Sequence, residues 1–284
     1  MPAFDLIAFD LDGTVIGDYV TRRMSDRVRD AFVAAHGAGV QTTVVSGRPI
    51  GMLDDQFDDQ PWLDWRITVN GACVDRGVDE DILVRRPMSH AMALDVIDSL
   101  KDLRAAWNAF SPGGPVFELR NFTYMAGRKA TSDRPHLPKT PSQIRRAIPN
   151  VRHVRSVRRY LASHRADVDK LGCSFPTPET SVEAEDRLTS RGDLEVARMG
   201  PAELELTLAG VTKGSALGIL CSRIGMDESR VVAFGDSGND LSMTGRDCTF
   251  VAMGNGTDQI KAAADDVCPS VADDGVACWL ERYL

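Results

Sequence analysis

The sequence predicts a doubly wound α/β fold, in which helices cover both faces of a mostly parallel sheet, together with an inserted second domain. Short apolar runs alternate with amphipathic helical segments at both ends of the 284-residue chain. Between residues 84 and 200 this alternation gives way to sequence that is punctuated by proline and rich in arginine. We therefore predict a discontinuous core domain, residues 1–83 and 201–284, and an inserted domain, residues 84–200.

The first third of the chain contains three apolar runs that are typical of buried strands. Ser25 is placed to cap the helix that follows the first run, and Gly37 to end it. Each run ends in polar or glycine residues, as strands of a parallel sheet do where they meet a turn. The first run spans residues 4–9 and is followed by Asp10. The second spans 40–45 and is followed by Ser46-Gly47-Arg48, and the third spans 67–69 and is followed by Asn70-Gly71.

The C-terminal part repeats this alternation of apolar runs and helical segments. A helix over 214–224 precedes an apolar run at 231–234, which leads into an acidic loop, and a further strand at 249–253 ends in Gly254-Asn255-Gly256. In open α/β sheets, ligands bind beyond the carboxyl ends of the strands. We therefore expect the polar clusters at these strand ends to converge in one crevice.

Basic residues concentrate in the inserted segment, which opens with a helix predicted from Ser89 to about Leu103. Between Arg120 and Lys170, thirteen Lys and Arg stand against three Asp and Glu. Two interpretations remain open: the stretch concentrates anionic substrates near the core, or its charges form solvated faces and pairs between domains, the commoner role of such arginines. The arginines concerned include Arg145, Arg146, Arg152, Arg155, Arg158 and Arg159.

The composition excludes several classes of protein. A net charge of −8 disfavours binding to nucleic acid. No apolar stretch reaches the roughly 18 residues needed to cross a bilayer, and residues 1–17 lack the features of an export signal. We expect no membrane partner and a cytoplasmic protein whose six scattered cysteines are buried thiols, neither zinc ligands nor disulfides. The sequence leaves the oligomeric state open.

Asp10-Leu11-Asp12-Gly13-Thr14 carries the first chemical signal. Asp10 and Asp12 stand two residues apart at the end of a hydrophobic run, and in an ideal strand both would share a face. Two neighbouring carboxylates repel each other and are most easily stabilised by a hard cation, whose oxygen shell Asp236 and Asp240 can complete. An oxygen-only site of this kind suits Mg²⁺.

Three further motifs follow along the chain: Ser46 after the second strand, Lys213 before an apolar-striped helix, and the acidic loop 235–240. In this order the four motifs resemble those of phosphatases among the haloacid dehalogenase-like hydrolases, and the insertion resembles the α/β cap of their Cof-like branch. The resemblance covers roughly residues 1–83 and 201–284. It implies a Rossmann-like doubly wound core, an inserted α/β cap and an enzyme that cleaves phosphate esters.

The resemblance assigns four catalytic residues. Asp10 is the nucleophile that takes up the phosphoryl group, and Asp12 protonates the leaving alcohol and later activates water. Ser46 donates its hydroxyl to phosphate oxygens, and Lys213 neutralises the transferring group and steadies the nucleophile. These roles suit the chemistry, because a carboxylate nucleophile divides ester hydrolysis into two steps that need charge neutralisation and a switch of proton state.

The resemblance also implies contacts to metal and phosphate. Mg²⁺ would be held by carboxylates and by the backbone carbonyl of Asp12, while Asp240 either binds the metal or orients Lys213. Arg48 either holds a substrate phosphate or pairs with a carboxylate of the cap. The predicted phosphate contacts are Gly47, Arg48 and Asn239, and the predicted metal ligands are Asp10, Asp12, Asp236 and Asp240.

These observations predict a magnesium-dependent phosphatase that hydrolyses small phosphorylated metabolites through an aspartyl-phosphate, with sugar phosphates as the first substrate class. Neither a G-x-x-x-x-G-K-[ST] loop nor a G-x-S-x-G elbow occurs, which disfavours nucleotide-driven and serine-esterase chemistry. Two alternatives remain: a phosphomutase that uses the same aspartate, and a non-catalytic phosphate-binding protein.

Overall fold

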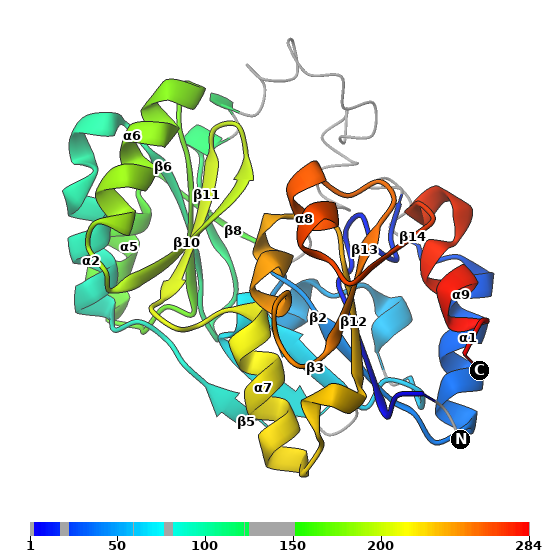
Figure 1. Cartoon of the computed structure of the whole chain (residues 1–284). Coiled ribbons are helices and arrows are strands. Elements are labelled where there is room, and N and C mark those ends of the chain that lie inside the picture. The colour runs from blue at the N-terminus through cyan, green and yellow to red at the C-terminus, as the bar shows by residue number, and fades with distance from the viewer. Residues whose placement is uncertain are drawn as a thin grey trace. The chain divides into compact units, whose positions relative to one another are not determined.

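The computed structural model describes residues 3–17, 23–58, 60–76, 82–121, 123–124 and 151–283. The chain divides into two compact units (Figure 1). Much of the predicted basic stretch, including Arg145 and Arg146, lies outside the described residues. Unit 1 consists of Met1–Arg48, Leu53–Val84 and Thr212–Leu284, and unit 2 of Pro49–Met52 and Arg85–Val211.

Unit 1 is built on an eight-stranded sheet. Its strands are β1 (Leu6–Phe9), β2 (Gln41–Val45), β3 (Trp65–Thr68), β4 (Cys73–Arg76), β5 (Ile82–Arg85), β12 (Val231–Gly235), β13 (Thr249–Met253) and β14 (Asp266–Cys268). Their order in the sheet is β14-β13-β12-β1-β2-β3-β4-β5. Neighbours from β14 to β3 pair in parallel, whereas β3 and β4 are antiparallel.

Helices cover both faces of this sheet (Figure 1). The four helices of unit 1 among the described residues are α1 (Asp26–Gly37), α7 (Lys213–Ile224), α8 (Asp258–Ala263) and α9 (Gly275–Leu280). One hydrophobic cluster joins the sheet to α1 and α9, and another joins its opposite face to α7 and α8. The predicted doubly wound core is confirmed.

The two clusters follow from the alternation of side chains along β1. Ile7 and Phe9 belong to the cluster beneath α1, and Phe9 stacks on Phe32 of that helix with ring centroids 4.4 Å apart. Leu6 and Ala8 belong to the cluster beneath α7. All four β1 residues are buried, which is why the strand reads as a continuous apolar run in the sequence.

Helix boundaries in unit 1 follow local signals that are visible in the sequence. The Ser25 side chain accepts a hydrogen bond from the backbone N–H of Val28, and α1 ends at Gly37, as predicted. α7 begins after a capping box formed by Thr212 and Ser215. No helix in the described part of the chain has the length and hydropathy needed to cross a bilayer.

Unit 2 contains a six-stranded sheet with the order β10-β11-β9-β6-β7-β8. Helices α2, α5 and α6 pack on one face of it through a single hydrophobic cluster (Figure 1). The elements are α2 (His90–Ser99), β6 (Ala106–Phe110), β7 (Val116–Glu118), β8 (Arg152–Val154), α5 (Val157–His164), β9 (Lys170–Ser174), α6 (Pro178–Thr189), β10 (Leu194–Gly200) and β11 (Glu203–Leu208).

Two details of unit 2 differ from the sequence analysis. Residues 201–211, which were assigned to the core, group with unit 2, because β11 pairs with both β10 and β9 in the second sheet. The helix expected over 89–103 ends at Ser99, and a 3₁₀ helix, Lys101–Leu103, follows it. In the basic stretch, Arg158 forms an ion pair with Asp98 at 2.5 Å, a contact within unit 2.

A left-handed turn, Val69–Gly71, follows β3 in unit 1. Its three residues have φ values of 54°, 57° and 96°. Valine rarely adopts a positive φ, because its β-branched side chain crowds the backbone. The turn is held by two backbone hydrogen bonds, from the N–H of Val69 to the carbonyl of Arg48 and from the N–H of Asn70 to the carbonyl of Ser46, each 3.0 Å.

We predict that Gly71→Ala lowers the free energy of unfolding by at least about 3 kcal/mol. A left-handed conformation costs a residue with a Cβ about 1–2 kcal/mol. A Cβ on Gly71 would also lie 2.2 Å from the carbonyl oxygen of Thr212, so the backbone must shift. Gly39→Ala is the matched control, because Gly39 has a φ of 87° with no atom within 4 Å of the new Cβ. Equal losses in urea unfolding would contradict the prediction.

Candidate active site

The side chains of three predicted motifs lie where neighbouring parallel strands end. Asp10 follows β1, Ser46 follows β2 and Asp236 follows β12, and these strands are adjacent in the order β12-β1-β2. The backbone pairing continues past the strand, since the N–H of Asp10 donates to the carbonyl of Phe234 at 3.0 Å. The expected convergence at the carboxyl ends of the strands is therefore observed within unit 1.

Lys213, the first residue of α7, bridges two of the predicted acidic residues. Its Nζ donates to Oδ1 of Asp10 and to Oδ1 of Asp240, both at 2.7 Å, and the Lys213 side chain is fully buried. Burial alone would lower the pKa of this ammonium group, but the two carboxylates outweigh burial and raise it. Lys213 therefore remains charged and draws the end of β1 and the acidic loop together.

Asp240 lies in the 3₁₀ helix Gly238–Met243 and is completely buried. Its second oxygen, Oδ2, accepts the backbone N–H groups of Asp236 and Ser237 at 3.0 and 3.1 Å. Both carboxylate oxygens thus already hold protein donors. Of the two roles considered for Asp240, this hydrogen bonding favours orientation of Lys213.

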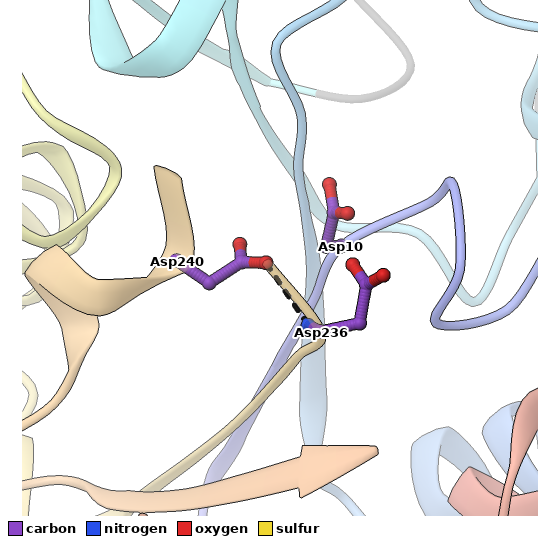
Figure 2. Close-up of side chains that lie close together, drawn as sticks. All are labelled: Asp10, Asp236 and Asp240. Carbon is purple, nitrogen blue, oxygen red and sulfur yellow. Dashed lines mark hydrogen bonds between the residues drawn. The ribbon is translucent and has the colours of Figure 1, made fainter. Parts of the chain in front are cut away.

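Asp10, Asp236 and Asp240 gather into an acidic cluster, and one carboxylate oxygen from each lies within 4.8 Å of the others (Figure 2). Oδ1 of Asp236 is buried without a hydrogen-bond partner among the described residues. Oxygen donors of this kind are the ligands that hard divalent cations prefer. The orphaned oxygen and the donor chemistry therefore fit a divalent cation between Asp10 and Asp236.

Without a cation the cluster strongly disfavours ionisation. Burial raises the pKa of Asp10 to about 7, with Lys213 opposing this effect and Asp240 adding to it. Burial also raises the pKa of Asp236 to about 8, and the charges of Asp10 and Asp240 reinforce that shift. A cation bound here would favour the charged forms of both groups.

The Asp12 side chain does not join this cluster. The chain turns after β1, and the Asp12 carboxylate accepts two hydrogen bonds from the guanidinium of Arg48. A third Arg48 donor, Nη1, reaches Oδ2 of Asp54 at 2.7 Å. The expectation that Asp10 and Asp12 share a face therefore does not hold for their carboxylates, because both residues lie beyond the end of the strand.

Gly13 makes this turn possible. Its φ is 87°, and a Cβ on it would lie 2.2 Å from Oδ2 of Asp236. The carbonyl oxygen of Gly13 accepts a hydrogen bond from Asn255 Nδ2 at 2.8 Å, which fixes the turn. The glycine of the first motif is thus needed for the close approach of Asp236, a reason that the sequence alone did not reveal.

One of the predicted phosphate-binding residues, Asn239, contacts a residue to which the sequence analysis gave no site role. Asn239 donates its side-chain amide to Oδ1 of Asn70 at 3.2 Å. The Oγ of Ser46 accepts the backbone N–H of Arg48 at 3.2 Å. Asn70 is buried and left-handed; its sequence signal, Asn followed by Gly71 at a strand end, placed it among the polar strand ends but gave no site role.

A family model described as haloacid dehalogenase-like hydrolase matches residues 7–280, which is nearly the whole chain. The chain belongs to the haloacid dehalogenase-like hydrolases. The resemblance inferred from the four motifs is therefore confirmed, as are the doubly wound core and the inserted α/β cap domain of these hydrolases.

Curated relatives of this hydrolase are phosphatases. The 5-amino-6-(5-phospho-D-ribitylamino)uracil phosphatase YcsE of Bacillus subtilis (strain 168) is 26% identical over 280 residues, covering 98% of this chain and 95% of the relative. The pyridoxal phosphate phosphatase YbhA of Escherichia coli (strain K12) is 25% identical over 280 residues, covering 98% of both chains.

A similar solved structure is that of the subclass IIB sugar phosphatase BT4131, with a TM-score of 0.79, 22% identity and 98% coverage of both chains. At this identity the likeness shows the fold. The family match and the phosphatase relatives together show that this haloacid dehalogenase-like hydrolase is a phosphatase. The prediction of a phosphoric monoester hydrolase is thereby confirmed.

We predict that metal-free protein loses stability as the pH rises from about 4 to about 8, and that Asp236→Asn weakens this loss. The pKa of Asp236 is raised from 3.8 to about 8 in the folded state, so the folded chain holds a proton that the unfolded chain has released. Stability therefore falls as pH rises through that window. The melting temperatures of the wild type and of Asp236→Asn, measured in chelator from pH 5 to 9, check this prediction. Parallel curves of melting temperature against pH for the two proteins would refute it.

Proposed function

We propose that this phosphatase hydrolyses small phosphate monoesters, with sugar phosphates as the first class, through an aspartyl-phosphate on Asp10, and that it depends on Mg²⁺. The observation that carries the proposal is the Asp10 carboxylate, held by Lys213 beside an Asp236 oxygen that has no hydrogen-bond partner in the described part of the chain. A nucleophile fixed between an ammonium group and a cation site is suited to attack on an anionic phosphoryl group.

Asp10 performs the first step as the nucleophile. Lys213 holds Oδ1, and we assign the attack on phosphorus to Oδ2. The P–O bond to the leaving alcohol breaks as the bond to Oδ2 forms, which gives the aspartyl-phosphate. Lys213 orients Asp10, favours its ionised form together with a bound cation, and offsets charge on the phosphoryl oxygens.

Asp12 moves the protons. As an acid it donates a proton to the departing alcohol oxygen, and as a carboxylate it later removes a proton from the water that hydrolyses the aspartyl-phosphate. Its side chain is 32% exposed, so substrate and water have access to it. The separation of its carboxylate from the acidic cluster gives it an electrostatic environment distinct from that of Asp10.

The remaining site residues bind the metal and the phosphate. Asp10 and Asp236 would hold the divalent cation with their carboxylates, and Asp12 with its backbone carbonyl. A bound cation supplies positive charge against the phosphoryl oxygens. Around it, we assign phosphate contacts to residues at the ends of β2 and β12, namely Ser46, Gly47, Arg48 and Asn239.

Two observations support the substrate class. The two curated relatives are named for a ribitylamino uracil phosphate and for pyridoxal phosphate, small metabolites that carry a phosphate monoester. The sugar phosphatase BT4131 shares the fold over 98% of both chains. The site described in unit 1 recognises the phosphoryl group, which all these esters share.

We predict that the protein releases phosphate from members of a panel of sugar phosphates, nucleotides and other phosphorylated metabolites in the presence of Mg²⁺, and that Asp10→Asn lowers kcat at least about 10³-fold. An amide matches the shape of the carboxylate but cannot form the aspartyl-phosphate. Asp5→Asn serves as the control, because Asp5 is exposed and pairs with Arg230 at the surface.

The same panel distinguishes the alternatives. Unchanged release by the Asp10→Asn protein would overturn the mechanism. A mutase would interconvert sugar phosphates, respond to a sugar bisphosphate and release little phosphate. Binding without turnover of any ester would instead support a phosphate-binding protein.

We predict that removal of divalent metal stops hydrolysis and that Mg²⁺ restores it, because the clustered carboxylates need a cation to accept an anionic substrate. Asp236→Asn should raise the Mg²⁺ concentration for half-maximal activity at least about tenfold, since it removes one proposed ligand. Titration of activity with Mg²⁺ after chelation measures both effects. Full activity in chelator would refute the metal requirement.

A further inference from the structure

The loop that follows β13 in unit 1 contacts both segments that carry the proposed metal ligands. Asn255 in this loop donates its Nδ2 to the carbonyl oxygen of Gly13 at 2.8 Å, although β12 lies between β13 and β1 in the sheet. The backbone N–H of Thr257 donates to the carbonyl oxygen of Asp236 at 3.1 Å. One short loop therefore holds both the turn after β1 and the start of the acidic loop.

Both ends of the Asn255 amide form hydrogen bonds. Its Oδ1 accepts the backbone N–H of Val271 at 2.8 Å, at the start of the 3₁₀ helix Val271–Asp273. A backbone N–H on one side and a carbonyl oxygen on the other call for a side chain that carries both an acceptor and a donor. Asn255 is exposed, so its substitution removes these two bonds and little buried surface. The residue is therefore suited to fixing the position of the backbone that it contacts.

Gly13 is the point at which the first motif meets Asp236. A Cβ on Gly13 would lie 2.2 Å from Oδ2 of Asp236 and 2.6 Å from its Cγ, so this backbone closely approaches the Asp236 carboxylate. The peptide group before Gly13 contains the backbone carbonyl of Asp12, which is another proposed metal ligand. The hydrogen bond from Asn255 therefore holds the backbone that carries one proposed ligand where it approaches a second.

We propose that Asn255 is a positioning residue for the divalent cation, which acts by holding the backbone of Asp12 and Gly13 at the separation from Asp236 that Mg²⁺ requires. The inference rests on the proposed function, because that function assigns the metal and its ligands. Mg²⁺ demands near-ideal octahedral geometry at about 2.0–2.1 Å, so a carbonyl that is free to shift binds it less tightly. In this role Asn255 itself binds neither the metal nor the phosphoryl group.

The loss expected on removal of the Asn255 amide falls on metal binding. Residues that orient metal ligands typically contribute about 10–100-fold to metal affinity. The carboxylates of Asp10 and Asp236 remain in the variant, so the cation still binds, although more weakly, and excess Mg²⁺ restores the site. A role in folding alone would instead lower the melting temperature and leave the affinity for Mg²⁺ unchanged.

Calorimetric titration of Mg²⁺ into the metal-free protein, without substrate, tests the role. We expect Asn255→Ala to raise the Kd for Mg²⁺ at least about fivefold. In phosphate release from the ester that the wild type hydrolyses fastest, the same variant should raise the Mg²⁺ concentration for half-maximal activity by a similar factor. Its kcat at saturating Mg²⁺ should stay within about twofold of the wild-type value, because the reacting groups are unchanged.

Two further variants complete the experiment. Gln259→Ala is the matched control, because it removes the same kind of amide from an exposed residue of α8, four positions further along the chain. It should leave the Kd for Mg²⁺ unchanged. Asn255→Leu keeps the approximate size of the side chain without its hydrogen-bonding groups and should weaken Mg²⁺ binding as much as Asn255→Ala does. It also keeps the test valid if Asn255→Ala fails to fold.

The outcomes separate this role from the proposed function. If the wild type binds Mg²⁺ and hydrolyses an ester, and either Asn255 variant binds Mg²⁺ as tightly, the role of Asn255 is overturned while the proposed function stands. A loss of kcat that excess Mg²⁺ does not restore would also overturn it, because that loss lies outside metal binding. If the wild type neither binds Mg²⁺ nor needs it for hydrolysis, the proposed metal dependence fails and the inference with it. A raised Kd with kcat restored by excess Mg²⁺ supports both.

Discussion

The buried ammonium of Lys213 between Asp10 and Asp240 is the interaction on which the site depends. It joins the end of β1, the start of α7 and the acidic loop after β12, three segments that are distant in the sequence. Removing one member of such a group leaves an uncompensated buried charge, which is strongly destabilising. The capping of α7 by Thr212 therefore has two effects: it fixes where the helix begins, and it positions Lys213, the first residue of the helix.

The balance of charge around Lys213 connects stability to function. One ammonium group faces three clustered carboxylates, so full ionisation would leave an excess of negative charge in a buried place. Burial raises the pKa values of Asp10 and Asp236, and the neighbouring carboxylates add to this effect. A divalent cation relieves it, and so does protonation. The imbalance that we predict to weaken the metal-free fold at higher pH is the same one that a divalent cation would neutralise in the proposed mechanism.

Local signals in the sequence were sufficient for the fold of the core and for the residues of the four motifs. Strand ends, the Ser25 cap and the Asp10–Thr14 motif depend on near neighbours in the chain, and the structure agrees with them. What could not be predicted depends on distant partners. The pairing of Arg48 with Asp12, the packing of Gly13 against Asp236 and the pairing of β11 with β9 are fixed by tertiary contacts that leave no local pattern.

The two carboxylates of the first motif show how neighbouring residues acquire different chemistry. Asp10 faces an ammonium group inside a buried acidic cluster, and Asp12, two residues later, faces a guanidinium at a more exposed position. The turn at Gly13 belongs to the same short segment, beyond the end of β1. Each carboxylate has its own cation, so the ion pair of Asp12 with Arg48 is separate from the bond between Lys213 and Asp10. In the mechanism that we propose, Asp12 transfers protons while Asp10 acts as the nucleophile, a division of roles set by environment.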